Sequence, residues 1–114
     1  MGARGAVNKE NAAYPATLDA LVVALCADYE RREASLHSSL VCRRVAMEYR
    51  YINSRIYEAA AEIAGDRYAA QYIIEIGRRI GYAHSAVNLL SETGYKEQKR
   101  LVKFNIARKM HLLD

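Results

Sequence analysis

The sequence predicts a small all-α protein, and three observations lead to that prediction. Glycine occurs six times and proline once in 114 residues, and neither occurs between positions 16 and 64. Because glycine and proline are the residues that most often end helices, this composition favours long helical segments. Hydrophobic residues make up 52% of the chain, and they recur at the three- and four-residue spacing of helices with one buried face.

The length of the chain is enough for one domain with a modest core. Residues 1–14 are mostly small and polar and show no periodicity, so we expect a flexible tail there. The rest of the chain, residues 15–114, then forms a single helical domain.

The sequence of residues 17–64 predicts a long antiparallel helix pair, which forms the first part of this domain. Apolar spacing predicts one helix from Leu18 to Glu33 and a second from Ser39 to Ala64. The serine-rich stretch at 34–38 is the expected turn between them, because serine competes for backbone hydrogen bonds.

The sequence after residue 64 predicts three more helices, so the expected total is about five. Gly65 is expected to end the second helix, and Asp66 to cap the third. Thr93 and Gly94 predict a further break. The three expected helices cover residues 67–80, 84–91 and 95–112.

A helix–turn–helix pattern occupies residues 66–91. Such a motif needs a small residue where the helices touch, an apolar residue before the turn, a turn residue that tolerates positive φ, and apolar residues facing back. The residues at these positions are Gly77, Ile80, Gly81, Val87 and Leu90. A helical hairpin or a kinked helix over 67–90 is the alternative interpretation.

The stretch from Glu75 to Val87, EIGRRIGYAHSAV, resembles the region-4-type helix–turn–helix of sigma factors. It is also similar to phage and prophage regulators of the RinA and ArpU type. The resemblance implies that the second helix is a recognition helix that presents four residues outward to DNA: His84, Ser85, Asn88 and Leu89.

Positive charge is concentrated in the same half of the chain. Residues 66–114 hold nine Lys and Arg against five Asp and Glu, a difference equal to the whole net charge of +4. An excess of this kind suits a polyanionic partner. The expected phosphate contacts are Arg78, Arg79, Lys96, Lys99 and Arg100.

Duplex DNA is therefore the expected partner, with a second copy of the chain and RNA polymerase as further candidates. The alternative is a non-catalytic helical module for protein–protein interaction or oligomerisation. Two observations keep that alternative open: the stretch 84–92 carries no Lys or Arg, and tyrosines cluster along the long helices. Four arginines beside the apolar stripe of the second helix are expected to form a solvated face. They are Arg43, Arg44, Arg50 and Arg55.

The remaining patterns predict neither catalysis nor a bound cofactor. Cys26 and Cys42 lack the spacing of a redox or zinc motif, so we expect two reduced thiols. The three histidines are far apart and form no metal-binding motif. The chain has no leader pattern and no apolar run that is long enough to cross a bilayer, which predicts a cytoplasmic protein. It also has no phosphate-binding glycine loop and no G-x-S-x-G motif, so we expect a protein that is not an enzyme.

Overall fold

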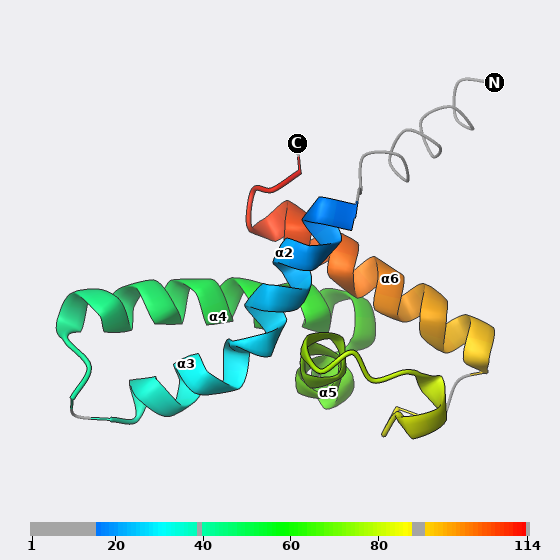
Figure 1. The fold of residues 1–114 in the computed structure, drawn as a ribbon, viewed down its shortest axis with the longest axis horizontal. Helices are drawn as coiled ribbons and strands as arrows, with labels where there is room; N and C mark the ends of the chain where they lie inside the picture. The colour runs from blue at the N-terminus through cyan, green and yellow to red at the C-terminus, as the bar shows by residue number, and fades with distance from the viewer. Residues whose placement is uncertain (1–15, 39, 88–90, 114) are drawn as a thin grey trace.

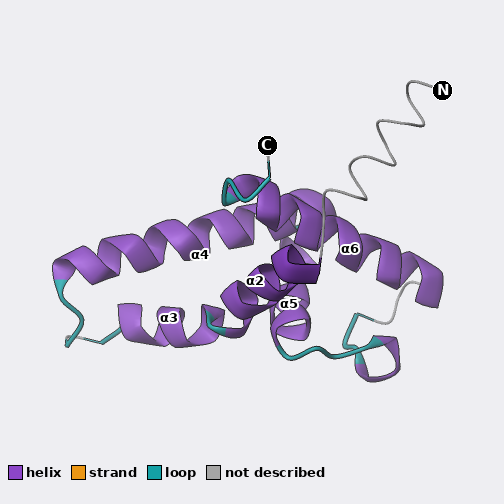
Figure 2. Ribbon diagram, turned by 45° about the horizontal axis from the view of Figure 1, so that its top comes forward, coloured by secondary structure: helices purple, strands orange, loops and turns teal. Residues whose placement is uncertain are grey.

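The structure is a computed structural model that describes residues 16–38, 40–87 and 91–113. Within these residues the chain forms helices and no strand, which confirms the predicted all-α class (Figures 1 and 2). No helix in this part is long and apolar enough to cross a membrane. The elements are α2 (Ala16–Ala27), α3 (Tyr29–Leu36), α4 (Arg43–Ala64), α5 (Asp66–Gly77), the 3₁₀ turn η1 (Tyr82–His84) and α6 (Glu92–Lys109).

The apolar core lies between α2, α5, α6 and the C-terminal half of α4. Each of these helices contributes a side chain with no exposed surface: Val22, Ile56, Ile73 and Ile106. Full burial of one such side chain stabilises the fold by roughly 1.5–3 kcal/mol. The apolar residues that recur at helical spacing in the sequence therefore pack into this shared core.

The helices α3 and α4 form an arm that projects from the core (Figure 1). We use "the arm" for α3 together with residues 43–55 of α4. The predicted antiparallel pair is present here, but only α3 pairs with α4 in this way. The preceding helix, α2, instead crosses to pack against α5 and α6.

The helix expected from Leu18 to Glu33 is broken at Asp28, so the prediction of one continuous helix is wrong. The Asp28 carboxylate accepts a hydrogen bond from Arg31 Nε at 2.7 Å. Aspartate favours helix ends because its side chain competes for local hydrogen bonds. The break turns α3 away from the core and toward α4.

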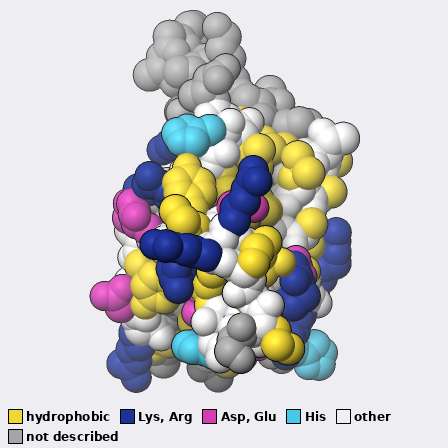
Figure 3. Space-filling view, turned by 90° about the vertical axis from the view of Figure 1, so that its left-hand side faces the viewer, with side chains coloured by type: hydrophobic (Ala, Val, Ile, Leu, Met, Phe, Trp, Pro, Cys, Tyr) yellow, Lys and Arg dark blue, Asp and Glu magenta, His cyan; other side chains and the backbone are white. Residues whose placement is uncertain are grey.

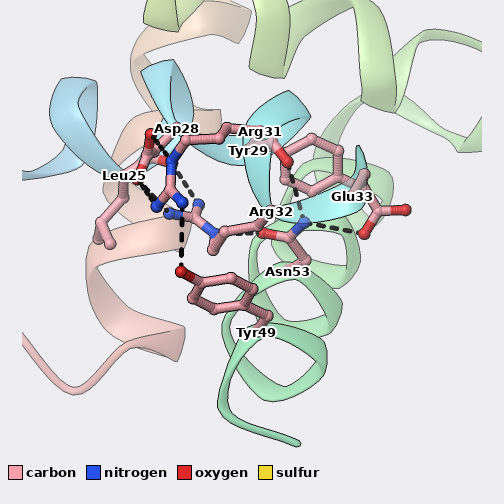
Figure 4. A network of polar contacts seen from close by, with 8 residues as sticks. All are labelled: Leu25, Asp28, Tyr29, Arg31, Arg32, Glu33, Tyr49 and Asn53. Carbon is pink, nitrogen blue, oxygen red and sulfur yellow. Dashed lines mark hydrogen bonds and ion pairs between the residues drawn. The ribbon is translucent and has the colours of Figure 1, made fainter. Parts of the chain in front are cut away.

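A buried polar network joins α3 to α4 (Figure 4). The Arg32 side chain is buried and donates from Nε to Asn53 Oδ1 at 2.6 Å and from Nη2 to the Leu25 carbonyl at 2.5 Å. Asn53 donates in turn to the Tyr29 carbonyl at 3.1 Å and to Glu33 Oε2 at 2.8 Å. Hydrogen bonds through Arg32 and Asn53 therefore join α3 to α4 in this part of the arm.

The turn predicted at 34–38 lies where α3 ends, but α4 begins at Arg43 and not at Ser39, which is outside the described residues. Gly65 ends α4 as predicted, with a left-handed φ of 81°. Asp66 is the first residue of α5 and does not act as its cap.

The turn after α5 differs from the prediction. The helix ends at Gly77, three residues before the expected Ile80. Gly81 has an extended backbone with φ −91° and ψ 178°, so the positive φ expected there is wrong. Arg79 adopts the left-handed conformation instead, with φ 56°.

The helix expected over 84–91 is wrong in its first half. Ser85 has extended dihedral angles, and residues 85–87 are not helical. The last helix begins at Glu92, so the break expected at Thr93 and Gly94 is also wrong. Ser91 caps this helix by accepting a hydrogen bond from the Gly94 amide at 3.1 Å.

Candidate functional site

A buried carboxylate organises the connection between α5 and α6. Glu75 has no exposed surface and accepts hydrogen bonds from Gln71 Nε2 at 2.8 Å and from the Ala86 amide at 2.8 Å. The hydroxyls of Ser85 and Tyr95 each donate to it at 2.6 Å. Glu75 therefore fastens the connecting segment to both helices.

These hydrogen bonds also set the charge state of Glu75. Burial raises the pKa of a carboxyl group, but the bonds from Ser85, Tyr95, Gln71 and the Ala86 amide outweigh it and leave the Glu75 pKa below its usual value. Burial and the bond to Glu75 raise the pKa of Tyr95, so its hydroxyl keeps its proton. The site holds an anionic carboxylate inside the protein.

Glu75 also explains why the expected second helix of the motif does not begin at His84. The Ser85 hydroxyl donates to Glu75 and accepts from the Val87 amide at 2.8 Å. Side-chain oxygens thus satisfy the amides of Ala86 and Val87, and a local side-chain bond of this kind competes with helix formation.

The turn at Arg79 is attached to α6 through the Ile80 carbonyl. Lys99 Nζ donates to the Ile80 carbonyl at 2.5 Å, and the Tyr95 hydroxyl lies 3.4 Å from the same oxygen. The Lys99 ammonium also lies 5.5 Å from the centre of the Tyr95 ring. The end of α5 and the middle of α6 are therefore tied together.

A small basic pocket of about 170 Å³ opens beside this turn. Arg79, Lys99 and Lys103 line it together with Asp19, which lies 3.0 Å from Lys103 Nζ. Burial lowers the pKa of Lys99, and the positive charge of Lys103 lowers it further. The two ammonium groups therefore repel each other across a confined space.

The basic residues of α6 continue from this pocket toward the start of the helix. Lys96, Lys99, Arg100 and Lys103 are spaced by three and four residues and share one helix face. Lys96 pairs with Glu92 at 2.8 Å, and Arg100 pairs with Glu97 at 2.6 Å. Exposed pairs of this kind contribute little to stability, so these cations can exchange partners at small cost.

The other predicted contact residues lie elsewhere. Arg78 is exposed and pairs with Glu30 of α3 at 3.0 Å. His84 is exposed on η1, and Ser85 is engaged with Glu75. Asn88 and Leu89 are outside the described residues. The structure thus places Arg79 beside the α6 cations. Arg78 and Ser85 have partners elsewhere, and His84 does not line the basic pocket.

The predicted structural positions have mixed outcomes. Gly77 does lie at a close helix contact, but its partner is α2, where an added Cβ would come within 2.7 Å of Cys26 and Ala27 backbone atoms. Val87 is buried in the core as expected. Ile80 is only partly buried, and Leu90 is outside the described residues.

The role of Glu75 in this site was not predicted from the sequence. An acidic residue inside the run Ile73–Ile76 was the available signal, because a charge on an apolar face needs buried partners. Among the described residues there is no cluster of three or more His, Cys, Asp or Glu that could hold a metal ion.

Comparison with known proteins does not extend this description, because no protein-family model, no curated protein and no solved structure matches the chain.

Proposed function

We propose that this chain binds duplex DNA as a small transcriptional regulator, through a basic face on α6 and on the turn that follows α5. The basic face comprises Arg79, Lys96, Lys99, Arg100 and Lys103. One observation carries the proposal: Arg79 from the turn after α5 and Lys99 and Lys103 from α6 line one small pocket, together with Asp19. A phosphate group at this pocket would relieve the repulsion between Lys99 and Lys103.

The remaining cations of the basic face extend the same contact. Lys96 and Lys103 are seven residues apart, which is about 10 Å along a helix. Phosphate contacts supply much of the affinity of proteins for DNA and fix their register on the duplex. The ion pairs to Glu92 and Glu97 would open in favour of phosphate oxygens.

Under this proposal, the N-terminal half of α6 takes the role expected of the helix at 84–91. An α-helix fits the major groove of B-DNA. Thr93 and Glu97 are exposed beside Lys96 on this half of α6, so they are the side chains that would meet base edges. The Glu75 network would hold α6 at a fixed angle to α5.

Fluorescence anisotropy with a labelled mixed-sequence duplex tests the proposal. Five phosphate contacts predict that log K falls with log salt with a slope of about −4 to −5. The double variant Lys96→Gln/Arg100→Gln should bind at least about tenfold more weakly at low salt and should reduce the slope by about 2.

A matched control removes two arginines at the far ends of the same helices. Arg67 and Arg108 are exposed, and each stacks on an aromatic ring. The variant Arg67→Gln/Arg108→Gln has the same net charge as the test variant and should bind DNA like the wild type. Undetectable binding of the wild type at low salt, or equal losses in both variants, would reject the proposal.

A second candidate function is a helical protein–protein interaction module. The observation that favours it is the outer side of the arm, where Met47 and Tyr51 are exposed among arginines. Tyrosine, methionine and arginine are enriched in the cores of protein interfaces.

A further inference from the structure

The outer face of α4 carries large apolar side chains that the core does not use. Met47 is 62% exposed and Tyr51 48% exposed, and Leu40, just before the helix, is 93% exposed. Figure 3 looks onto the tip of the arm, end-on to α4, where hydrophobic side chains lie among Lys and Arg side chains. An exposed apolar patch with a polar rim is typical of an interaction site.

This face is hollowed along its length. One groove of about 510 Å³ is lined by Met47, Arg50 and Tyr51, and it reaches Ser54 and Glu58. A second hollow of about 640 Å³ begins at the same Ser54 and Glu58. It continues toward the end of α4 between α3 and α5, with Glu33, Tyr57, Ala61, Glu62 and Asp66 in its lining. Together they form one continuous surface, which we call the α4 face.

Charge is divided between the two halves of the α4 face. In the N-terminal half of α4, Arg43, Arg44 and Arg50 stand against Glu48, and Arg55 follows directly after Ser54. The C-terminal half of the α4 face is lined by acidic groups from three helices. These groups are Glu33, Glu58, Glu62 and Asp66. Arg43 and Arg50 form no ion pair with any residue that the structure describes.

We infer that the α4 face binds a second copy of this chain, with the two α4 helices antiparallel across a twofold axis near Ser54. In a twofold interface, residue i of one chain contacts residue j of the other, and j contacts i. An antiparallel pairing therefore sets the basic half of each helix against the acidic half of its partner. This inference is independent of the proposed DNA binding.

The spacing of residues around Ser54 fits such an axis. Arg50 and Glu58 each lie four residues from Ser54, so Arg50 of one copy lies opposite Glu58 of the other. Met47 and Ala61 each lie seven residues from it, which sets a large side chain against a small one. The short Ser54 side chain at the axis allows the two helices to approach closely.

Glu58 already has an ion-pair partner within its own chain, and the proposed dimer is compatible with that ion pair. Lys109 Nζ lies 2.8 Å from Glu58 and 2.6 Å from Glu62. Lys109 can therefore stay with Glu62 while Glu58 accepts Arg50 of the second copy. Exchange between exposed ion pairs costs little.

Sedimentation velocity on the full chain and on two charge-reversed variants tests the inference. The wild type should show a concentration-dependent dimer. Arg50→Glu and Glu58→Arg should each associate at least about tenfold more weakly, because like charges then face each other at two symmetric contacts. An equimolar mixture of the two variants should recover the dimer, since every contact in the mixed pair again joins opposite charges.

Disulfide trapping locates the axis. In a Cys42→Ser background, Ser54→Cys should form a disulfide-linked dimer on mild oxidation, whereas Ala70→Cys on the exposed side of α5 should not. Thermal melts of all variants check the fold. A wild type that stays monomeric, a mixture that does not recover the dimer, or equal trapping at both cysteines would overturn the inference.

Discussion

Gly77 lies so close to Ala27 that a Cβ on the glycine would fall 2.6 Å from the Ala27 backbone nitrogen. This contact sets the distance between the end of α5 and the end of α2. The atoms that would be met belong to the backbone, so a rotamer change cannot relieve the overlap.

We expect Gly77→Ala to destabilise the protein by roughly 1–3 kcal/mol, which is the usual cost of overpacking. The higher helix propensity of alanine offsets only about 1 kcal/mol of that cost. Urea unfolding measures the difference. Gly81→Ala is the control, because Gly81 has nothing within 4 Å of an added Cβ and an ordinary φ, and it should be neutral or slightly stabilising. Equal effects at both glycines would contradict the close-contact explanation.

Replacement of the buried carboxylate should loosen the connection between α5 and α6. In Glu75→Gln, an amide group replaces one oxygen that accepts hydrogen bonds, so donors from Ser85, Ala86 or Tyr95 lose their acceptor. We expect a loss of about 2–4 kcal/mol. Hydrogen exchange should show the largest change at the Ala86 and Val87 amides. Glu48→Gln, on the exposed side of α4, should change neither measurement.

Glu75 should also contribute to the pH dependence of stability. Its pKa in the folded protein lies below the ordinary value of 4.5. The contribution is therefore complete above the unfolded-state pKa and is lost as the pH falls through the folded-state pKa. Unfolding free energies measured from pH 7 to pH 3 should fall more steeply for the wild type than for Glu75→Gln. Parallel curves would exclude Glu75 as the source.

The hydrogen bond between Arg32 and Asn53 should show strong energetic coupling. A double-mutant cycle with Arg32→Met and Asn53→Leu should give a coupling free energy of roughly 1–3 kcal/mol, because each single change leaves a buried polar group without its partner. The exposed pair Arg44 and Glu48, 4.0 Å apart, is the comparison and should give less than about 0.5 kcal/mol. Similar values for the two pairs would argue against a structural role for the buried network.

The two cysteines should differ sharply in reactivity. Cys26 is buried, and burial raises its pKa to about 12, whereas Cys42 is exposed. A thiol reagent should modify one cysteine in the native protein and two in denaturant, since the thiolate is the reactive form. Cys42→Ser should abolish the native reaction, and rapid native modification of Cys26 would contradict its buried position.

The all-α class and most helix centres were predictable because they depend on local composition and on apolar spacing. The break at Asp28 was not, since no glycine or proline marks it and the bend is held by contacts between Arg32 and the distant Asn53. The close contact at Gly77 was anticipated, but its partner helix was not, because a small residue does not indicate which helix will approach it.

For the candidate site, too, the features that depend on local sequence were predicted and those that depend on distant contacts were not. Lys96, Lys99 and Arg100 were recognised from charge alone, and α6 presents them on one face. The helix expected at 84–91 failed because Glu75, ten residues before Ser85, supplies acceptors that local patterns do not reveal. Likewise, Arg79 takes the positive φ assigned to Gly81, so the position of the turn depends on how the following segment is anchored.

The polar interior of the arm has a consequence for how the protein unfolds. Because the buried Arg32 and Asn53 side chains join α3 to α4, and Ile56 is the first buried apolar residue of α4, we expect the arm and the core to be unequal cooperative units. The arm should open first, as a subglobal event in which the amides of residues 43–52 exchange while those around Ala59 and Ala60 stay protected. A partner bound along the arm would suppress this opening and so raise the stability of one half of a helix more than the other.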